Sequence, residues 1–368
     1  MKKSLLMLLG VFLALPVVAR DFSYEYKGQT LTYTVLDEDA KTVETKAGDF
    51  FGDTPGNDVS GELIIPAKVT DGKDIFKVTA IGECAFQHCT SLTSIVIPEG
   101  ITSISQRAFK SCYSLISVSL PEGITSISPW VFWNCYSLTS ITIPESVTSI
   151  DDEAFSGCYG LTSISIPEGV TSIGQGVFSS CTSLTSISIP EGVTSIANLA
   201  FWDCTSLTSI SIPEGVTSIG AWAFLDCTSL TSIVIPQGIS SIGEFAFEGC
   251  DGLKSVYYVS DNPISITHIN NIGATCNIFS WKTYENAILY MTEDGMMLGR
   301  YIEPWKNFKH VSLFDPAGIE EISADFDENA PCEIYNLSGV KVSDTIEGLT
   351  PGLYIVRQGN AVKKIEVR

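Results

Sequence analysis

A spacing of 23 residues governs most of this chain. An isoleucine row from Ile81 to Ile242 and a phenylalanine row from Phe86 to Phe247 keep this step. Eight cysteines keep it without a slip: Cys89, Cys112, Cys135, Cys158, Cys181, Cys204, Cys227 and Cys250. A fixed period of about 20 to 50 residues is typical of solenoids, in which each unit contacts only its neighbours. The chain is therefore expected to form a stack of similar coils.

The repeat unit predicts where each coil is extended. The unit that begins at Ile166 reads IPEGVTSIGQGVFSSCTSLTSIS. At its end, Ile187 and the following Ile189 alternate with serines, so the isoleucines should point inward and the serines outward, as in a half-buried strand. Pro190 cannot donate a ladder hydrogen bond and should end that strand. Further along, the V-T-S-I segment is expected to add a second short apolar ridge to each coil.

A single coil should not fold by itself. Its few apolar side chains cannot offset the conformational entropy lost when 23 backbone units become ordered. Stacking adds ladder hydrogen bonds and a continuous core, so stability is expected only for the array.

The repeat resembles a known bacterial family. The pattern I-P-x-x-V-T-S-I-G-x-x-A-F-x-x-C-x-S-L-T-S-I is similar to the BspA-like leucine-rich repeat of bacterial surface proteins, over about residues 63–257. Its end fits the L-x-x-L-x-L strand of leucine-rich repeats. The resemblance implies a mainly β leucine-rich-repeat solenoid of 23-residue coils with β caps. It also implies surface exposure and adhesion to host proteins or other cells.

The first residues read as an export signal. Lys2 and Lys3 precede an apolar run from Leu5 to Val18, and small residues precede a cut after Ala19. The run is too short for a comfortable membrane span. No cysteine at the predicted cut could carry a lipid anchor. Residues 1–19 are therefore expected to be a signal peptide, and the protein to be secreted or placed on the outer cell surface.

Capping regions are expected on both sides of the solenoid. Alternating polarity from Leu31 to Val35 predicts an N-terminal β cap at 20–62. Residues 63–257 form the predicted solenoid, and residues 258–315 a C-terminal cap. Aromatic residues of that cap are expected to pack on the last coil: Trp281, Tyr284, Tyr290, Tyr301, Trp305 and Phe308.

Residues 316–368 are expected to form a separate small β-sandwich-like domain. The segments Ile334–Val342, Leu349–Val356 and Lys363–Arg368 read as short strands joined by turns. This region resembles the C-terminal sorting-type domain of Bacteroidetes secreted proteins. The resemblance implies an origin in those bacteria and export beyond the periplasm.

Charge excludes some partners. The net charge of -21 argues against nucleic-acid binding and against docking on an anionic membrane. It favours cationic or neutral partners. A glutamate row is interpreted as a solvated edge, with a cation-binding stripe as the alternative: Glu99, Glu122, Glu145, Glu168, Glu191 and Glu214, continued by Gln237.

Large aromatic residues at variable positions are the candidate ligand-binding residues. Two slots of the repeat hold tryptophans, the first Trp133 and Trp202, the second Trp130 and Trp222. A stacked ladder is predicted for the residues that follow three successive cysteines, namely Tyr113, Tyr136 and Tyr159. Such side chains are enriched at binding hot spots. Partial burial against the next coil is the structural alternative, and the serine-rich strand face is the other candidate surface.

Catalytic motifs are absent from the sequence. It contains no G-x-S-x-G, H-E-x-x-H or P-loop pattern, and its three histidines are scattered. We expect no enzyme, no cofactor and no metal. The leading hypothesis is a binding or adhesion protein for an extracellular protein or another cell. A glycan-binding protein that uses the tryptophans and tyrosines is the alternative, and a hydrolase site in the C-terminal cap is a third.

The aligned cysteines should be free thiols. An even number of cysteines in an exported chain would fit disulfides, but in-register side chains of adjacent coils point the same way, so their Cβ vectors do not converge. Metal ligands surround an ion and do not form a line. Denaturation in a thiol-blocking buffer should therefore label most ladder cysteines. Mass spectra that show them mainly as disulfides would contradict this geometry.

Overall fold

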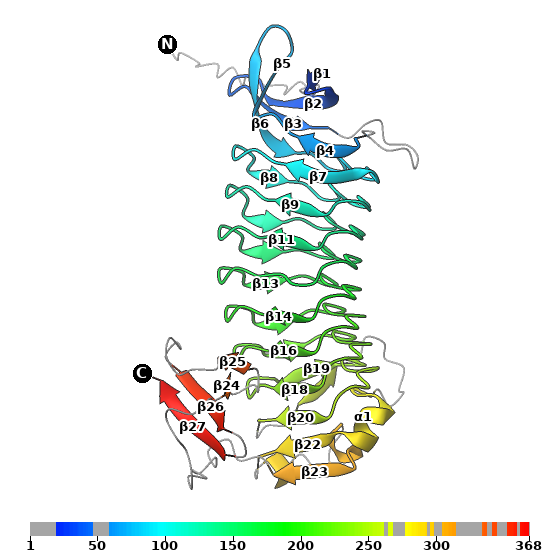
Figure 1. The fold of residues 1–368 in the computed structure, drawn as a ribbon, viewed down its shortest axis with the longest axis vertical. Helices are drawn as coiled ribbons and strands as arrows, with labels where there is room; N and C mark the ends of the chain where they lie inside the picture. The colour runs from blue at the N-terminus through cyan, green and yellow to red at the C-terminus, as the bar shows by residue number, and fades with distance from the viewer. Residues whose placement is uncertain are drawn as a thin grey trace, which may run out of the picture.

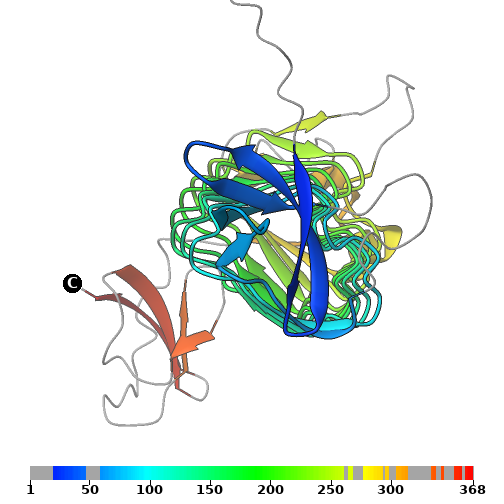
Figure 2. The ribbon, with the colours of Figure 1, turned by 90° about the horizontal axis from the view of Figure 1, so that it is seen from above.

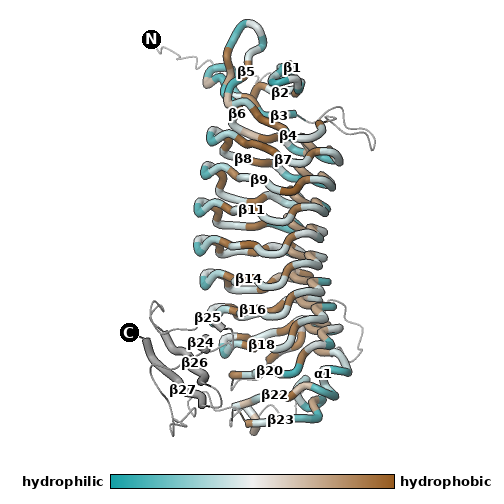
Figure 3. Tube along the Cα trace, in the orientation of Figure 1, coloured by the Kyte–Doolittle hydropathy of each residue, from teal (hydrophilic) through white to brown (hydrophobic). Residues whose placement is uncertain are grey.

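The computed structural model describes residues 20–46, 59–260, 264–267, 277–292, 295–297 and 304–313, together with four strands between 333 and 367. The predicted signal peptide and Tyr301 lie outside the described residues. The repeats stack into a straight rod (Figure 1), and the coils superimpose in the view down its long axis (Figure 2). Apolar stretches recur at the same place in each coil, and polar turns recur along one edge (Figure 3).

One face of the rod is built from the strands that the L-x-x-L-x-L pattern predicts. The pairs are parallel and in register, as in Ser186↔Ser209 and Ile187↔Ile210. Ile187 is buried and the serines on both sides are exposed, as expected. The strands of the repeats are β4 (Gly61–Ile64), β7 (Leu92–Val96), β9 (Ser117–Ser119), β11 (Ser140–Thr142), β14 (Ser186–Ser188), β16 (Ser209–Ser211), β18 (Ser232–Ile235) and β20 (Ser255–Tyr258). The C-terminal cap continues this face with β22 (Ile288–Met291) and β23 (His310–Leu313), which the repeat pattern does not predict.

A second parallel ladder lies where only an apolar ridge was expected. The T-S-I segments are extended, and in-register stacking lets their backbone groups pair, as in Ile196↔Ile219. Most strands of this ladder have two residues, too few for alternating polarity to reveal. The ladder consists of β6 (Ile75–Ile81), β8 (Ser103–Ile104), β10 (Ser126–Ile127), β12 (Ser149–Ile150), β13 (Ser172–Ile173), β15 (Ser195–Ile196), β17 (Ser218–Ile219), β19 (Ser241–Gly243) and β21 (Ser265–Thr267).

The remainder of each coil is a turn that we call the Phe-Cys corner, defined as residues 130–136 and their equivalents in the other coils. Two of its positions have left-handed backbone, for example Trp130 (φ 55°) and Asn134 (φ 58°). This conformation is uncommon for residues with a Cβ. The Trp130, Phe132 and Asn134 N–H groups donate to carbonyls of the next coil, at 3.1, 2.9 and 2.8 Å. These bonds recur in successive coils and hold the left-handed residues in place.

The core consists of stacked side-chain rows. Rings from Phe86 to Phe247 follow one another at centroid distances of 5.0–5.8 Å, nearly parallel. Phe279 of the C-terminal region continues the row at 5.2 Å from Phe247. Phe279 therefore covers the last coil in the way that the phenylalanine of a further repeat would.

The ladder cysteines are buried and free, as predicted. Each thiol from Cys112 onwards donates to the phenylalanine carbonyl of the preceding coil, as Cys158 does to Phe132 at 3.3 Å. Burial raises the pKa of the Cys158 thiol to about 12. Cysteine therefore supplies an apolar volume and a protonated donor at one position.

The N-terminal cap covers the first coils with a mixed sheet in the order β1-β2-β3-β6-β5, and its register places Leu31, Tyr33 and Val35 of β2 inside. Its further strands are β1 (Asp21–Tyr26), β2 (Gln29–Asp37), β3 (Thr42–Thr45) and β5 (Lys68–Thr70). Residues 71–74, between β5 and β6, form a turn.

Most of the aromatic residues expected in the C-terminal cap pack as predicted. Helix α1 (Trp281–Asn286) begins at the N-cap Ser280, and a 3-10 helix spans Trp305–Asn307. Tyr284, Trp305 and Phe308 are buried around Phe279, and Tyr290 stacks on Tyr257. The prediction for Trp281 is wrong: it is 66% exposed, because it occupies the solvent-facing side of α1, whose buried residues are Thr283 and Tyr284.

The described residues beyond 332 form a sheet of their own. It is antiparallel, in the order β25-β24-β26-β27. The strands are β24 (Glu333–Asn336), β25 (Lys341–Ser343), β26 (Gly352–Gln358) and β27 (Ala361–Val367). They lie in the segments where the sequence predicts strands. Among the described residues this region has one layer, whereas a sandwich has two.

Removing one ring from the phenylalanine row should destabilise the array. Phe178 is fully buried and stacks on Phe155 and Phe201 at 5.8 and 5.6 Å. Phe178→Ala should cost about 3–5 kcal/mol, as for other large core truncations. Because coils contact only neighbours, limited proteolysis should detect new cleavage near this coil. Unchanged denaturant midpoint and cleavage pattern would contradict a core role.

Alkaline pH should weaken the fold through the thiols. Because burial raises the thiol pKa from the ordinary value near 9.0 to about 12 in Cys158, its stabilisation is complete below about pH 9 and is lost as pH rises towards 12. Each such thiol contributes a slope of about 1.4 kcal/mol per pH unit. Denaturant unfolding should therefore give a shallower alkaline slope for Cys158→Ala than for wild type. Equal slopes would show that this thiol does not titrate on unfolding.

Candidate functional site

The predicted tyrosine ladder forms on the outer surface of the Phe-Cys corner. Tyr113 and Tyr136 stack at a centroid distance of 4.7 Å, and Tyr136 and Tyr159 at 4.8 Å. Tyr113 and Tyr159 are exposed, as is Ile116, which lies three residues after Tyr113. Partial burial between its neighbours raises the pKa of Tyr136. We call Tyr113, Ile116, Tyr136 and Tyr159 the tyrosine patch.

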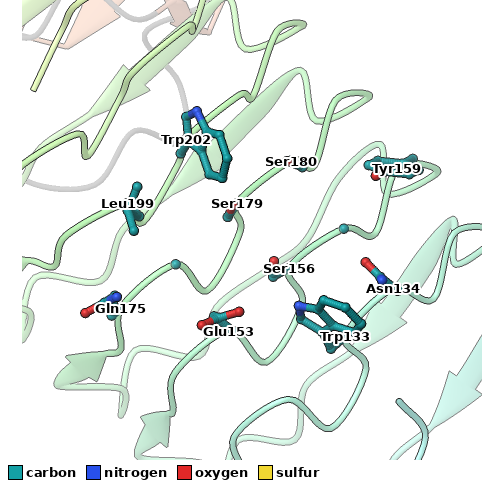
Figure 4. A pocket seen from close by; sticks show the side chains of 12 residues that line it. Trp133, Asn134, Glu153, Ser156, Tyr159, Gln175, Ser179, Ser180, Leu199 and Trp202 are labelled. Carbon is teal, nitrogen blue, oxygen red and sulfur yellow. The ribbon is translucent and has the colours of Figure 1, made fainter. Parts of the chain in front are cut away.

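A recess of about 330 Å³ lies next to this patch (Figure 4). Trp133 and Trp202 occupy the same slot of the repeat, three coils apart, and both line the recess. The two coils between them carry serine in that slot, so the row of large side chains is interrupted. The further lining residues are Asn134, Glu153, Ser156, Gly157, Tyr159, Gln175, Gly176, Ser179, Ser180 and Leu199.

Glycine deepens the recess where a side chain would fill it. Gly157 has φ 73°, and a Cβ there would lie 2.2 Å from Asn134 Oδ1. Gly176 has φ 59°, and a Cβ there would lie 3.1 Å from Glu153 Cγ. The left-handed backbone of the corner and the neighbouring side chains therefore both favour glycine at these positions.

Polar groups line the recess between its two tryptophans. Ser156 and Ser179 are only 9% and 6% exposed, and within the described residues neither hydroxyl has a hydrogen-bond partner. Glu153 is the carboxylate of the recess, and Asn134 and Gln175 are its amides. No lysine, arginine or histidine is found among the described lining residues. The recess thus joins aromatic surface with uncharged hydrogen-bonding groups and a single negative charge.

The tryptophans of the other slot lie outside the recess. Trp130 has the Arg107 guanidinium over its ring at 4.5 Å, and the Lys110 ammonium lies 4.4 Å from the centre of the Trp133 ring. Trp222 lies in the coil beyond Trp202 and does not line the recess. Of the residues predicted as a site, the structure therefore brings Trp133, Tyr159 and Trp202 around one recess. Tyr113 and Tyr136 continue from Tyr159 along the corner.

The polar rows remain open surface. The six glutamates of the predicted row are exposed, and the Glu122 N–H donates to Glu99 Oε2 at 3.4 Å.

Within the described parts of the chain, no group of three or more histidine, cysteine or acidic residues could hold a metal ion. Across the same parts, no helix has the length and apolar character that crossing a membrane requires.

Sequence reasoning named the tryptophans but missed the small residues between them. Ser156, Gly157, Gly176 and Ser179 make the recess, while Leu199 and Gln175 complete its walls. The sequence did contain a signal: Ser156 and Ser179 occupy a slot that holds a larger side chain, glutamine, lysine or tryptophan, in the three preceding coils.

Comparison with solved structures finds bacterial leucine-rich-repeat proteins. A leucine-rich repeat protein from Bacteroides ovatus ATCC 8483 is 26% identical, with a TM-score of 0.54, over 77% of this chain and 75% of that one. A T. pallidum leucine-rich repeat protein is 28% identical, with a TM-score of 0.47, over 54% of this chain and 87% of that one. A search of curated proteins found no match.

A family model matches the solenoid itself. It describes a BspA type leucine rich repeat region and matches residues 75–182 and 148–272. These overlapping matches cover more than half of the chain and coincide with the stacked coils. No enzyme family is indicated by these comparisons. The protein therefore belongs to the BspA-type leucine-rich repeat family.

Proposed function

We propose that this protein is a non-catalytic binding protein, secreted or displayed on the outer cell surface, that recognises an extracellular protein through its Phe-Cys corner. The observation that carries the proposal is the tyrosine patch. Tyr113 and Tyr159 are exposed and stack on the half-buried Tyr136 between them, and Ile116 is exposed as well. Exposed aromatic side chains held at fixed spacing are typical of protein contact sites.

Pre-organisation supports this role. The tyrosines stack on one another, and every coil beneath them is fixed by hydrogen bonds to its neighbours. Little side-chain entropy would therefore be lost when a partner covers them. The predicted export signal and the sorting-type resemblance of residues 316–368 support a location outside the cell.

The strand face is the less favourable contact surface. Its outward residues are mostly serine and threonine, for example Ser186 and Ser188 on β14. Small hydroxyl side chains offer little apolar area, and serine and threonine are under-represented at interface hot spots. The serine face is therefore the matched control surface for testing the tyrosine patch.

Partner binding should depend on the tyrosine patch. With the mature protein immobilised, a panel of purified extracellular-matrix and plasma proteins is measured by biolayer interferometry. For any partner bound, Tyr136→Ser combined with Tyr159→Ser should weaken affinity by about thirtyfold or more, the loss of roughly 2 kcal/mol expected for an anchor. The fold should persist, since both side chains lie on the outer surface.

The control pair is Ser186→Asn with Ser188→Asn on the strand face. We expect it to leave affinity unchanged. If the control pair abolishes binding and the tyrosine pair does not, the contact surface is the strand face. Failure of the whole panel to bind would argue against a protein partner among common extracellular proteins.

A further inference from the structure

We infer that the recess between Trp133 and Trp202 is a binding site for a short, neutral, linear oligosaccharide of two to four pyranose residues, lying along the axis of the rod. This goes beyond the protein contact proposed above and does not depend on it, although Tyr159 borders both surfaces. The spacing of the tryptophans, the serine hydroxyls and the charge of the recess all favour such a ligand.

The spacing of the tryptophans requires an extended ligand. The phenylalanines that directly precede this slot advance by 5.6, 5.8 and 5.6 Å per coil from Phe132 to Phe201. Ring partners lie about 4.5–7 Å apart when they are in contact. One planar ring therefore cannot contact Trp133 and Trp202 together. A ligand that uses both must present two separate apolar faces, one near each end of the recess.

A linear oligosaccharide has this form. Each pyranose offers an apolar C–H face to an aromatic ring and directs hydroxyls outward from its edge. Along a linear oligosaccharide, the distance from one sugar ring to the next is similar to the distance between adjacent coils of the rod. The volume of about 330 Å³ is at the lower end of the range of about 300–1,000 Å³ for small-molecule sites. Two or three sugar rings therefore match the recess in volume, and a chain of four rings would place one ring near each tryptophan.

The serine hydroxyls of the recess point to a hydrogen-bonding ligand. Ser156 and Ser179 are only 9% and 6% exposed as whole residues, and both line the recess. A hydroxyl both donates and accepts, so a serine pairs readily with sugar hydroxyls. Glu153, Asn134 and Gln175 add acceptors and donors around the same volume.

Charge selects a neutral ligand. Glu153 is the only acidic or basic residue among the described lining residues, and the chain as a whole carries a net charge of -21. The Lys110 ammonium lies over the Trp133 ring but does not line the recess, whose charged lining residue, Glu153, would repel a sulfate, phosphate or uronic-acid group. Sulfated and uronic-acid oligosaccharides should therefore bind more weakly than neutral ones.

A peptide fits the recess less well. Backbone groups of the corner are already paired between coils, as Phe155 N–H is with the Val177 carbonyl and Gly157 N–H with the Ser179 carbonyl. No strand edge at this place offers the regular row of donors and acceptors that an added peptide strand needs. The available groups of the recess are side-chain hydroxyls, amides and one carboxylate, which suit sugar hydroxyls.

The decisive variant fills the recess without disturbing the repeat. Ser179→Trp places tryptophan in a slot that already holds Trp133 and Trp202, so the backbone accommodates it. The matched control is Leu225→Trp, the same slot in the coil beyond Trp202 and outside the recess. The mature protein and both variants are titrated calorimetrically with neutral β-linked and α-linked gluco-, manno- and galacto-oligosaccharides of two to four units.

We expect wild type and Leu225→Trp to bind one or more of these oligosaccharides, and Ser179→Trp to bind none. Trp133→Ala and Trp202→Ala should each weaken affinity by about tenfold or more, as loss of an anchor does. Absence of binding to every neutral oligosaccharide, or equal binding by Ser179→Trp, would overturn the inference. So would a preference for sulfated oligosaccharides. Partner-protein affinity measured with the tyrosine-patch variants is a separate readout, so each proposal can fail without the other.

Discussion

The in-register hydrogen bonds between coils are the constraint on which the rest of this structure depends. Each coil must repeat the backbone of its neighbour, because a residue out of register would leave buried N–H and C=O groups unpaired. The same demand fixes the left-handed residues of the Phe-Cys corner, such as Trp130 and Asn134. It also explains the cysteines, since alanine in their place would not donate to the phenylalanine carbonyl of the preceding coil.

This constraint limits where a ligand can be recognised. Core positions change only between small or aliphatic residues, such as Ala154 and Val177, and the backbone repeats from coil to coil, so large differences lie in outward slots of the corner and turns. In one slot, lysine, tryptophan, serine, serine and tryptophan follow one another from Lys110 to Trp202. Substitutions in such a slot therefore change the shape of the surface from coil to coil. The binding surface can change in this way without loss of the fold.

The sequence predicts those features that repeat. We could infer the period, the inward-facing isoleucine of β14, the free thiols and the tyrosine ladder. Because the spacing is constant, a prediction made for one repeat applies to the equivalent positions of the others. Features that depend on how separate segments pack together could not be inferred from the sequence. The T-S-I ladder is too short to show alternation, and Trp281 packs according to the direction of one short helix. The recess exists because positions such as Ser156 and Gly176 carry no large side chain, and a small residue gives no sign of this in the sequence.

The Phe-Cys corner also gives the rod an electrical direction. Its backbone N–H groups donate towards the C-terminal end in every coil, from Phe86 to Ala108 and onward to Phe247, which donates to the Ile278 carbonyl. Peptide dipoles aligned in this way add, as they do in a helix, whereas the dipoles of β-strands largely cancel. The corner therefore contributes a dipole whose positive end faces the C-terminal end of the rod. A charged group near the corner would meet partial positive charge at the C-terminal end of this row and partial negative charge at its N-terminal end.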